Sequence, residues 1–154
     1  MHYDLTISIV TYNTNKEELL KVLKCLEKIK INKRIFISDN SEKQDIKKVI
    51  EELNSNQIEY IFNNSNKGFG AGHNVIINKL LKKELNSKYH LVMNSDVYFE
   101  EDVVEKLLDY MSNHKKIGQI GPRITGKDGT LTYSCKLFPT PLNLIMRRFI
   151  PLKK

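Results

Sequence analysis

Short apolar segments alternate with helical apolar patterns through most of this chain. Segments rich in β-branched residues and bounded by polar ones predict strands at residues 5–10, 34–38, 58–62 and 89–94. After each strand, apolar residues recur at the i, i+3, i+4 and i+7 spacing of an amphipathic helix. These positions are Leu19, Val22, Leu23, Leu26 and Ile29; Ile46, Val49, Ile50 and Leu53; Ile76, Ile77, Leu80 and Leu81; and Val103, Val104, Leu107, Leu108 and Met111. The pattern therefore predicts four strand-then-helix units.

Local patterns also predict where three of the helices begin. Thr14-x-x-Glu17 and Ser41-x-x-Gln44 match the capping box, in which a side-chain oxygen accepts from the first free backbone N–H groups. The fourth helix is expected to begin near Phe99. Its acidic residues 100–102 would then lie in the first turn, where they complement the helix dipole without any chemical role.

Repeated strand-then-helix units predict an α/β fold with a doubly wound, mostly parallel sheet of Rossmann-like topology, because each parallel step requires a crossover. Ligands of such sheets bind beyond the carboxyl ends of the strands. Here those ends read Thr11-Tyr12-Asn13, Asp39-Asn40-Ser41, Asn63-Asn64-Ser65 and Asn94-Ser95-Asp96. All are polar, which suits a nucleotide pocket, although loops and helix caps also favour these residue types.

The segment NSNKGFGAGHN, residues 64–74, places Gly68, Gly70 and Gly72 between the third strand and its helix. Glycines there would let backbone N–H groups approach an anion at the helix N-terminus. A tight turn with close helix packing explains the same pattern. The segment is not a dinucleotide-binding fingerprint, because it follows the third strand and has His73 where the spacing requires glycine.

Composition narrows the class of protein. The 154 residues carry a formal net charge of +7, but five basic residues and no acid follow Asp128, so residues 1–128 carry only +2. Most basic residues are lysine, which argues against nucleic-acid binding. The two cysteines, Cys25 and Cys135, fit no metal or disulfide pattern. No signal peptide or apolar membrane span is present in the sequence, so we expect a cytoplasmic protein of one main domain.

The motifs SIVTYN, ISDNSE, NKGFGAGHN, VMNSDV and IGQIGPRI, followed by DGT, occur in the order and approximate spacing of family 2 glycosyltransferases. The chain most resembles their bacterial rhamnosyltransferase-like branch, from about Leu5 to about Phe149. This resemblance implies a GT-A fold, a dTDP- or UDP-linked sugar donor, Mn²⁺ or Mg²⁺, and inverting transfer to a glycan or lipid-linked acceptor in cell-surface polysaccharide synthesis.

The resemblance also assigns residues. Asp39 matches the aspartate that contacts the base or ribose, and a carboxylate can accept from the imide N–H of uracil or thymine. Asp96 matches the second aspartate of a D-x-D metal motif, with Asn94 in the first position. One carboxylate plus donor phosphates can hold such a cation. The alternative for Asp96 is a helix cap. The remaining nucleotide-sugar-binding residues implied by the resemblance are Thr11, Tyr12, Asn13, Asn66, Lys67, Gly68, Asn74 and Ser95.

The last part of the chain is expected to differ from residues 1–135, which would form the nucleotide-sugar-binding domain. Residues 136–154 are basic and amphipathic, and the catalytic base that the resemblance implies is expected beyond Lys154. This segment would either contact an anionic membrane surface, at the inner face of the plasma membrane, or pack on a further part of the enzyme. In the second case it would leave an apolar patch that favours a homodimer.

Two functional hypotheses remain after the sequence has been considered. The first is the donor-binding part of a glycosyltransferase. The second is a non-catalytic nucleotide-binding or interaction module derived from such an enzyme.

Overall fold

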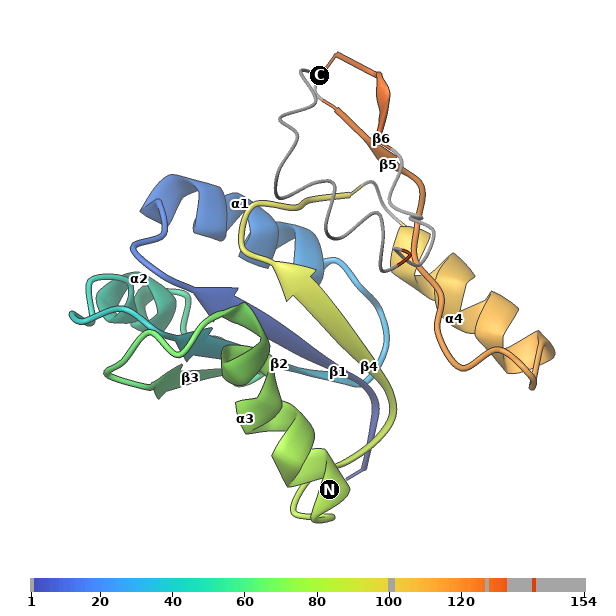
Figure 1. Cartoon of the computed structure of the whole chain (residues 1–154), viewed down its shortest axis with the longest axis horizontal. Coiled ribbons are helices and arrows are strands. Elements are labelled where there is room, and N and C mark those ends of the chain that lie inside the picture. The colour runs from blue at the N-terminus through green and yellow to red at the C-terminus, as the bar shows by residue number, and fades with distance from the viewer. Residues whose placement is uncertain (1, 100–101, 127, 133–139, 141–154) are drawn as a thin grey trace. The chain divides into compact units, whose positions relative to one another are not determined.

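The fold is described from a computed structural model, which describes residues 2–99, 102–126, 128–132 and 140 (Figure 1). The chain divides into two compact units, Met1–Gly118 and Gln119–Lys154. The expected boundary at residue 135, Cys135 itself and the basic segment 136–154 lie outside the described residues, apart from Thr140.

A four-stranded parallel sheet forms the centre of the first unit. Its strands are β1 (His2–Thr11), β2 (Lys33–Asp39), β3 (Ile58–Phe62) and β4 (Asn86–Asn94). They lie in the order β3-β2-β1-β4, and every pairing is parallel. The predicted strands and the doubly wound α/β class are therefore confirmed. The chain reverses its direction of strand addition between β1 and β4, so these two strands flank the position where such sheets bind ligands.

Helices cover both faces of this sheet. They are α1 (Lys16–Glu27), α2 (Lys47–Glu52), α3 (Phe69–Leu81) and α4 (Val103–Asn113). α1 and α2 lie on one face and α3 on the other (Figure 1). The four predicted apolar stripes match these four helices, and each helix contributes buried residues.

The two faces of the sheet differ in polarity because successive side chains of a strand point to opposite sides. On β1, Leu5, Ile7 and Ile9 belong to the main apolar core with α1 and α2. The alternate residues Thr6 and Ser8 are fully buried on the face that α3 covers. α3 thus packs on a partly polar surface, whereas α1 and α2 pack on an apolar one.

Helix starts differ in detail from the capping patterns. Asn15, not Thr14, caps α1, because its Oδ1 accepts from the N–H groups of Glu17 and Glu18. Ser41 caps no helix, since α2 begins later with Ile46 at its N-cap position, and its hydroxyl accepts from the Asn13 N–H instead. α4 begins at Val103 rather than near residue 99, so Asp96 is not its cap.

The Asn15 cap yields a stability prediction. Asn15→Ala removes the acceptor of two N–H groups and should lower the free energy of unfolding by about 1 kcal/mol, measured by urea denaturation. Thr14→Ala is the matched control, because the Thr14 hydroxyl accepts only from the Tyr12 N–H in the exposed loop. An equal loss in both variants would contradict the assignment of the cap to Asn15.

The second unit contains a small antiparallel hairpin, with β5 (Ile124–Thr125) paired to β6 (Leu131–Thr132). Its turn is closed by the Gly126 N–H, which donates to the Thr130 carbonyl, and Gly129 has a positive φ of 79°. Within the described residues, no helix is long and apolar enough to cross a membrane.

Candidate functional site

The carboxyl ends of the four strands form one polar edge. In the sheet register, Thr11 of β1 lies beside Asp39 of β2, Asp39 lies beside Phe62 of β3, and Val10 lies beside Asn94 of β4. The sequence-predicted residues at the ends of β1, β2 and β4 are therefore neighbours along this edge. The loops that follow the strands carry the remaining candidates.

Asp39 is the centre of a buried hydrogen-bond network at this edge. Its carboxylate is completely buried and accepts from three groups: the Thr11 hydroxyl at 3.1 Å, the Ser41 N–H at 3.0 Å and the Tyr60 hydroxyl at 2.6 Å. Burial raises the pKa of Tyr60, and the bond to Asp39 raises it further, so this hydroxyl remains a donor at neutral pH. The network fixes the end of β1 to β2 and extends through Ser41 to the Asn13 N–H.

Two asparagines anchor the glycine segment to the sheet. Neither was among the site residues that sequence analysis assigned. Asn40 donates from Nδ2 to the Gly68 carbonyl at 3.1 Å. Asn63 donates from Nδ2 to the Asn40 Oδ1 at 2.8 Å and to the Ser38 hydroxyl at 2.8 Å. Both asparagines directly follow a strand, and this position is the sequence feature that could have indicated a role at the site. Tyr60 lies inside a strand and carried no such signal.

The three glycines of the segment have different roles. Gly68 has φ +89°, a conformation that other residues rarely adopt, and precedes the first turn of α3. A Cβ at Gly72 would lie 2.6 Å and 2.8 Å from the two methyl groups of Val10, so this glycine allows α3 to pack closely on β1. A Cβ at Gly70 would meet nothing within 4 Å. The packing alternative therefore accounts for Gly68 and Gly72, whereas the site of Gly70 is open.

Several predicted residues are exposed around this edge. Tyr12, Asn13, Asn66, Lys67, Asn74 and Asn94 are all exposed, and Ser95 is partly buried. Asn13 has φ +48°, which turns the chain sharply after β1. A hollow of about 220 Å³ opens beside the ends of β1 and β2, where Asn13 and Ser41 meet the lysines Lys16 and Lys43. Asp45 also lines this hollow, so the buried network lies next to polar side chains and to charged ones of both signs.

Asp96 is exposed in the turn that follows β4. Among the described residues, its carboxylate forms no hydrogen bond and no ion pair, so both oxygens are available to a cation. No group of three His, Cys, Asp or Glu side chains within the described part of the chain could hold a metal ion on its own. A single carboxylate fits a Mg²⁺-type ion whose other ligands are donor phosphates and water.

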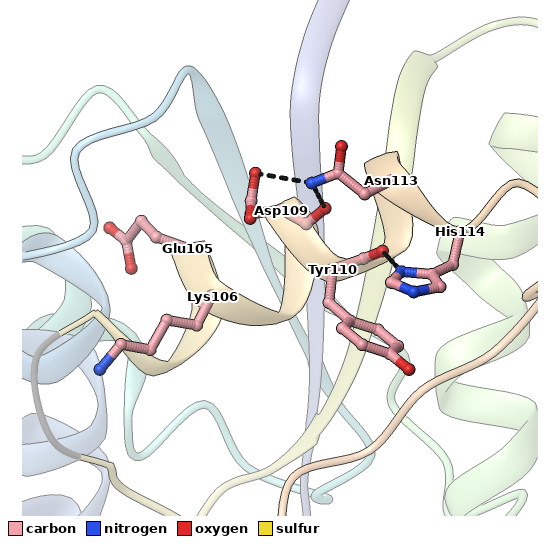
Figure 2. A pocket seen from close by; sticks show the side chains of 6 residues that line it. All are labelled: Glu105, Lys106, Asp109, Tyr110, Asn113 and His114. Carbon is pink, nitrogen blue, oxygen red and sulfur yellow. Dashed lines mark hydrogen bonds between the residues drawn. The ribbon is translucent and has the colours of Figure 1, made fainter.

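A second hollow, of about 500 Å³, lies along α4 (Figure 2). Its described walls are five residues of this helix and His114, the residue at its C-cap, whose ring stacks on that of Tyr110 with centroids 4.0 Å apart. Nothing from the sheet edge contributes to those walls. We therefore place the candidate site at the strand ends rather than on α4.

The fold of this chain is similar to that of a solved structure. The structure is similar to the crystal structure of TarS from S. aureus, with a TM-score of 0.59 and 19% sequence identity. The match covers 73% of this chain and 20% of the TarS chain, so this chain spans only a small part of that protein's length. The parallel four-stranded sheet is thus GT-A-like.

At the level of sequence, no curated protein matches this chain significantly. The family model for glycosyl transferase family 2 matches residues 6–153, which is nearly the whole chain. The chain belongs to glycosyl transferase family 2.

Proposed function

We propose that this chain binds a nucleotide-diphosphate sugar as the donor-binding part of an inverting glycosyltransferase. The observation that carries the proposal is the shared edge of β1, β2 and β4, where Thr11, Asp39 and Asn94 are neighbours and Asp96 follows directly. Thr11, Tyr12, Asn13 and Asp39 would contact the nucleoside. The segment with Asn66, Lys67, Gly68 and Asn74 would enclose the diphosphate and sugar, together with Asn94 and Ser95.

Asp96 would hold Mn²⁺ or Mg²⁺ against the diphosphate in this proposal. A bound divalent cation neutralises the charge that develops on a departing nucleotide diphosphate. Asp39 is buried beneath the Tyr60 and Thr11 hydroxyls, so its proposed contact with a base or ribose requires one of these donors to turn away. The donor would be dTDP- or UDP-linked, and the acceptor a glycan or a lipid-linked glycan of the cell surface.

Ligand-dependent stabilisation tests this proposal. At about 100 times its Kd, a ligand stabilises a protein by about 2.7 kcal/mol, which for this length corresponds to a rise in Tm of roughly 5–10 °C. We expect UDP or dTDP with Mn²⁺ to produce such a rise, and EDTA to remove most of it. If neither nucleotide shifts the Tm with or without Mn²⁺, the donor-site proposal is wrong.

Substitution of Asp96 tests the metal assignment separately. Asp96→Ala should abolish the part of the Tm rise that depends on Mn²⁺ and leave the metal-free part, because the fold loses no contact with this side chain. Asp109→Ala is the matched control, since it removes an exposed carboxylate on α4. Equal Mn²⁺ dependence in Asp96→Ala and the wild type would exclude Asp96 as the ligand.

A non-catalytic binding module is the second candidate. Both candidates predict nucleotide binding, and only an enzyme predicts turnover. Hydrolysis of a radiolabelled UDP- or dTDP-sugar by the chain, lost in Asp96→Ala, would favour the enzyme. Binding without any hydrolysis or transfer would favour the module.

A further inference from the structure

A chain of buried polar side chains connects α3 to β1 and β4. The Ser8 hydroxyl lies 2.7 Å from Nδ1 of His73 and 3.0 Å from Nε2 of His90. Nδ1 of His90 lies 2.9 Å from the Thr6 hydroxyl, which donates to the Tyr89 carbonyl at 3.4 Å. His73 is only 3% exposed, and Thr6 and Ser8 are fully buried. We call Thr6, Ser8, His73 and His90 the histidine chain.

One arrangement of protons satisfies every bond of the histidine chain with both rings neutral. Because Thr6 donates to the Tyr89 carbonyl, its oxygen accepts from Nδ1–H of His90. Nε2 of His90 then accepts from Ser8, and Ser8 accepts from Nδ1–H of His73. Nε2 of His73 remains as a bare, buried nitrogen with no partner among the described residues.

Protonation would disrupt this arrangement. A proton on Nε2 of His73 would be a buried donor without an acceptor. A proton on Nε2 of His90 would make Ser8 accept from both rings, and the Ser8 hydrogen would lose its acceptor in the histidine chain. The rings of Phe69 and His73 pack in a T-shaped contact with centroids 4.3 Å apart, and Phe69 supplies no acceptor oxygen. The histidine chain is therefore compatible only with neutral rings.

The surrounding charges give no compensation for a positive ring. The charged side chains on the packed elements are Asp4 on β1, Lys33, Arg34 and Asp39 on β2, Glu59 on β3, Lys79 on α3 and Lys88 on β4. Lys33 and Asp39 alternate with Arg34 and Ser38, so they point to the face opposite α3. Glu59 is paired with Arg34 and Lys79, and Asp4 is exposed near the amino end of β1. Lys83 and Lys88 line the same hollow as His90. Burial, with a smaller contribution from His73, lowers the pKa of His90 to about 4, and burial alone lowers the pKa of His73.

His73 stands between Gly72 and Asn74, at the end of the glycine segment. Gly72 packs on Val10, and its carbonyl accepts from the Ser38 hydroxyl. Beside these contacts, the bond from His73 to Ser8 is the polar link between this turn of α3 and β1. A change at His73 therefore acts on the backbone that carries Gly68 and Asn74.

We infer that His73 is a positioning residue for the glycine segment: through Ser8 and His90 it holds the first turns of α3 on the sheet, and it does so only while both rings are neutral. One consequence rests on the proposed function: donor affinity should fall as the histidine chain becomes protonated. The lowered pKa values of His73 and His90 mean that the folded state favours the neutral rings. The stabilisation is thus complete above the unfolded pKa of about 6.5 and is lost as the pH falls toward about 4.

Amide hydrogen exchange tests the positioning role without any ligand. The protection factors of residues 72–75 should fall about tenfold between pH 7 and pH 5 in the wild type, beyond any change in β2. His73→Asn retains an amide nitrogen near the position of Nδ1 but has no titratable ring at position 73, so its protection should change less with pH, and His90 should account for the change that remains. His114→Asn removes an exposed histidine of α4 and should retain the wild-type profile. Equal pH profiles in the wild type and His73→Asn would overturn the inference.

Ser8→Ala gives a second variant in case His73→Asn does not fold. It removes the bridging hydroxyl alone, so the protection of residues 72–75 should already be low at pH 7 and change little at pH 5. Wild-type protection in Ser8→Ala at both values would overturn the inference. Ring NMR of the wild type should show His90 neutral at pH 5.5, and titration of His90 near pH 6.5 would also overturn it.

Nucleotide binding separates the inference from the proposed function. The ratio of the Kd of the wild type to that of His73→Asn, for UDP or dTDP with Mn²⁺, cancels the titration of the nucleotide phosphates. We expect this ratio to stay near its neutral value at pH 5, where the folded rings are still neutral, and to rise several-fold as the pH falls to about 4. No binding by the wild type at pH 7.5 would refute the proposed function, and exchange would still decide the role of His73. Binding with a ratio that stays constant down to about pH 4 would refute the inference and leave the proposed function intact.

Discussion

Gly72→Ala is expected to lower the free energy of unfolding by about 1–3 kcal/mol, the usual cost of an added methyl group in a packed interior. The new Cβ would lie 2.6 Å and 2.8 Å from the methyl groups of Val10, whose side chain is only 8% exposed and branches at Cβ. Val10 cannot turn away freely, so α3 must move off β1. The Tm should fall by roughly 3–10 °C for a chain of this length.

Gly70→Ala is the matched control for this prediction. It lies two residues earlier in the same helix, and its Cβ would meet nothing within 4 Å. Alanine is favoured over glycine inside a helix by about 1 kcal/mol, so the Tm should stay constant or rise slightly. Thermal unfolding followed by circular dichroism measures both variants. A similar fall in both would show that contact with Val10 is not the reason for glycine at position 72.

Asp39→Ala should have the second large effect, a loss of about 2–4 kcal/mol in the free energy of unfolding. The variant leaves the Thr11 hydroxyl, the Ser41 N–H and the Tyr60 hydroxyl without their acceptor. Each buried group without a partner costs about 1–3 kcal/mol, and hydroxyl rotation and entry of water recover part of that cost. Urea denaturation of the apo protein measures the loss.

Tyr60→Phe shows how the effect is divided within this network. It removes one of the three donors to Asp39 and should cost about 1 kcal/mol. A loss as large as that of Asp39→Ala would mean that Tyr60, rather than the carboxylate, holds the ends of β1 and β2 together. A negligible loss in Asp39→Ala would contradict the network as the stabilising feature of this edge.

The strands and apolar stripes could be predicted from sequence because they follow local periodicity. The segment 58–62 is β3 to the residue. Every predicted helical stripe coincides with an observed helix, although Ile29, Ile46 and Leu53 lie just outside the helix bounds. Helix starts were less predictable, because Thr14 and Asn15 are both good caps and only the backbone conformation selects between them. Ser41 is also a good cap residue by type, but its hydroxyl accepts from the Asn13 N–H instead of capping a helix.

Only the part of the candidate site that lies at the strand ends could be predicted from the sequence. The periodic pattern predicted that Thr11, Asp39 and Asn94 lie at one edge, since parallel strands end together. The strand order, which the pattern did not predict, makes β1 the neighbour of both β2 and β4. The pattern could not show that Asp39 is buried under Tyr60, nor that Asn40 and Asn63 hold Gly68. These contacts join residues more than twenty positions apart, and they depend on how α3 and β3 pack. The histidine chain joins residues still further apart, because Ser8 bonds His73 across 65 positions and His90 across 82.

The strand order has a consequence for the synthesis of this protein. β1 leaves the ribosome before its partner β4, which follows more than eighty residues later, as the separation of 84 between Thr6 and His90 illustrates. Until β4 emerges, one side of β1 has no partner strand, and Ser8 and Thr6 lack the ring that they bond. The nascent chain can therefore complete the sheet only after Asn94 has been synthesised. Before that point, the unpaired side of β1 is the surface that a cellular chaperone would bind.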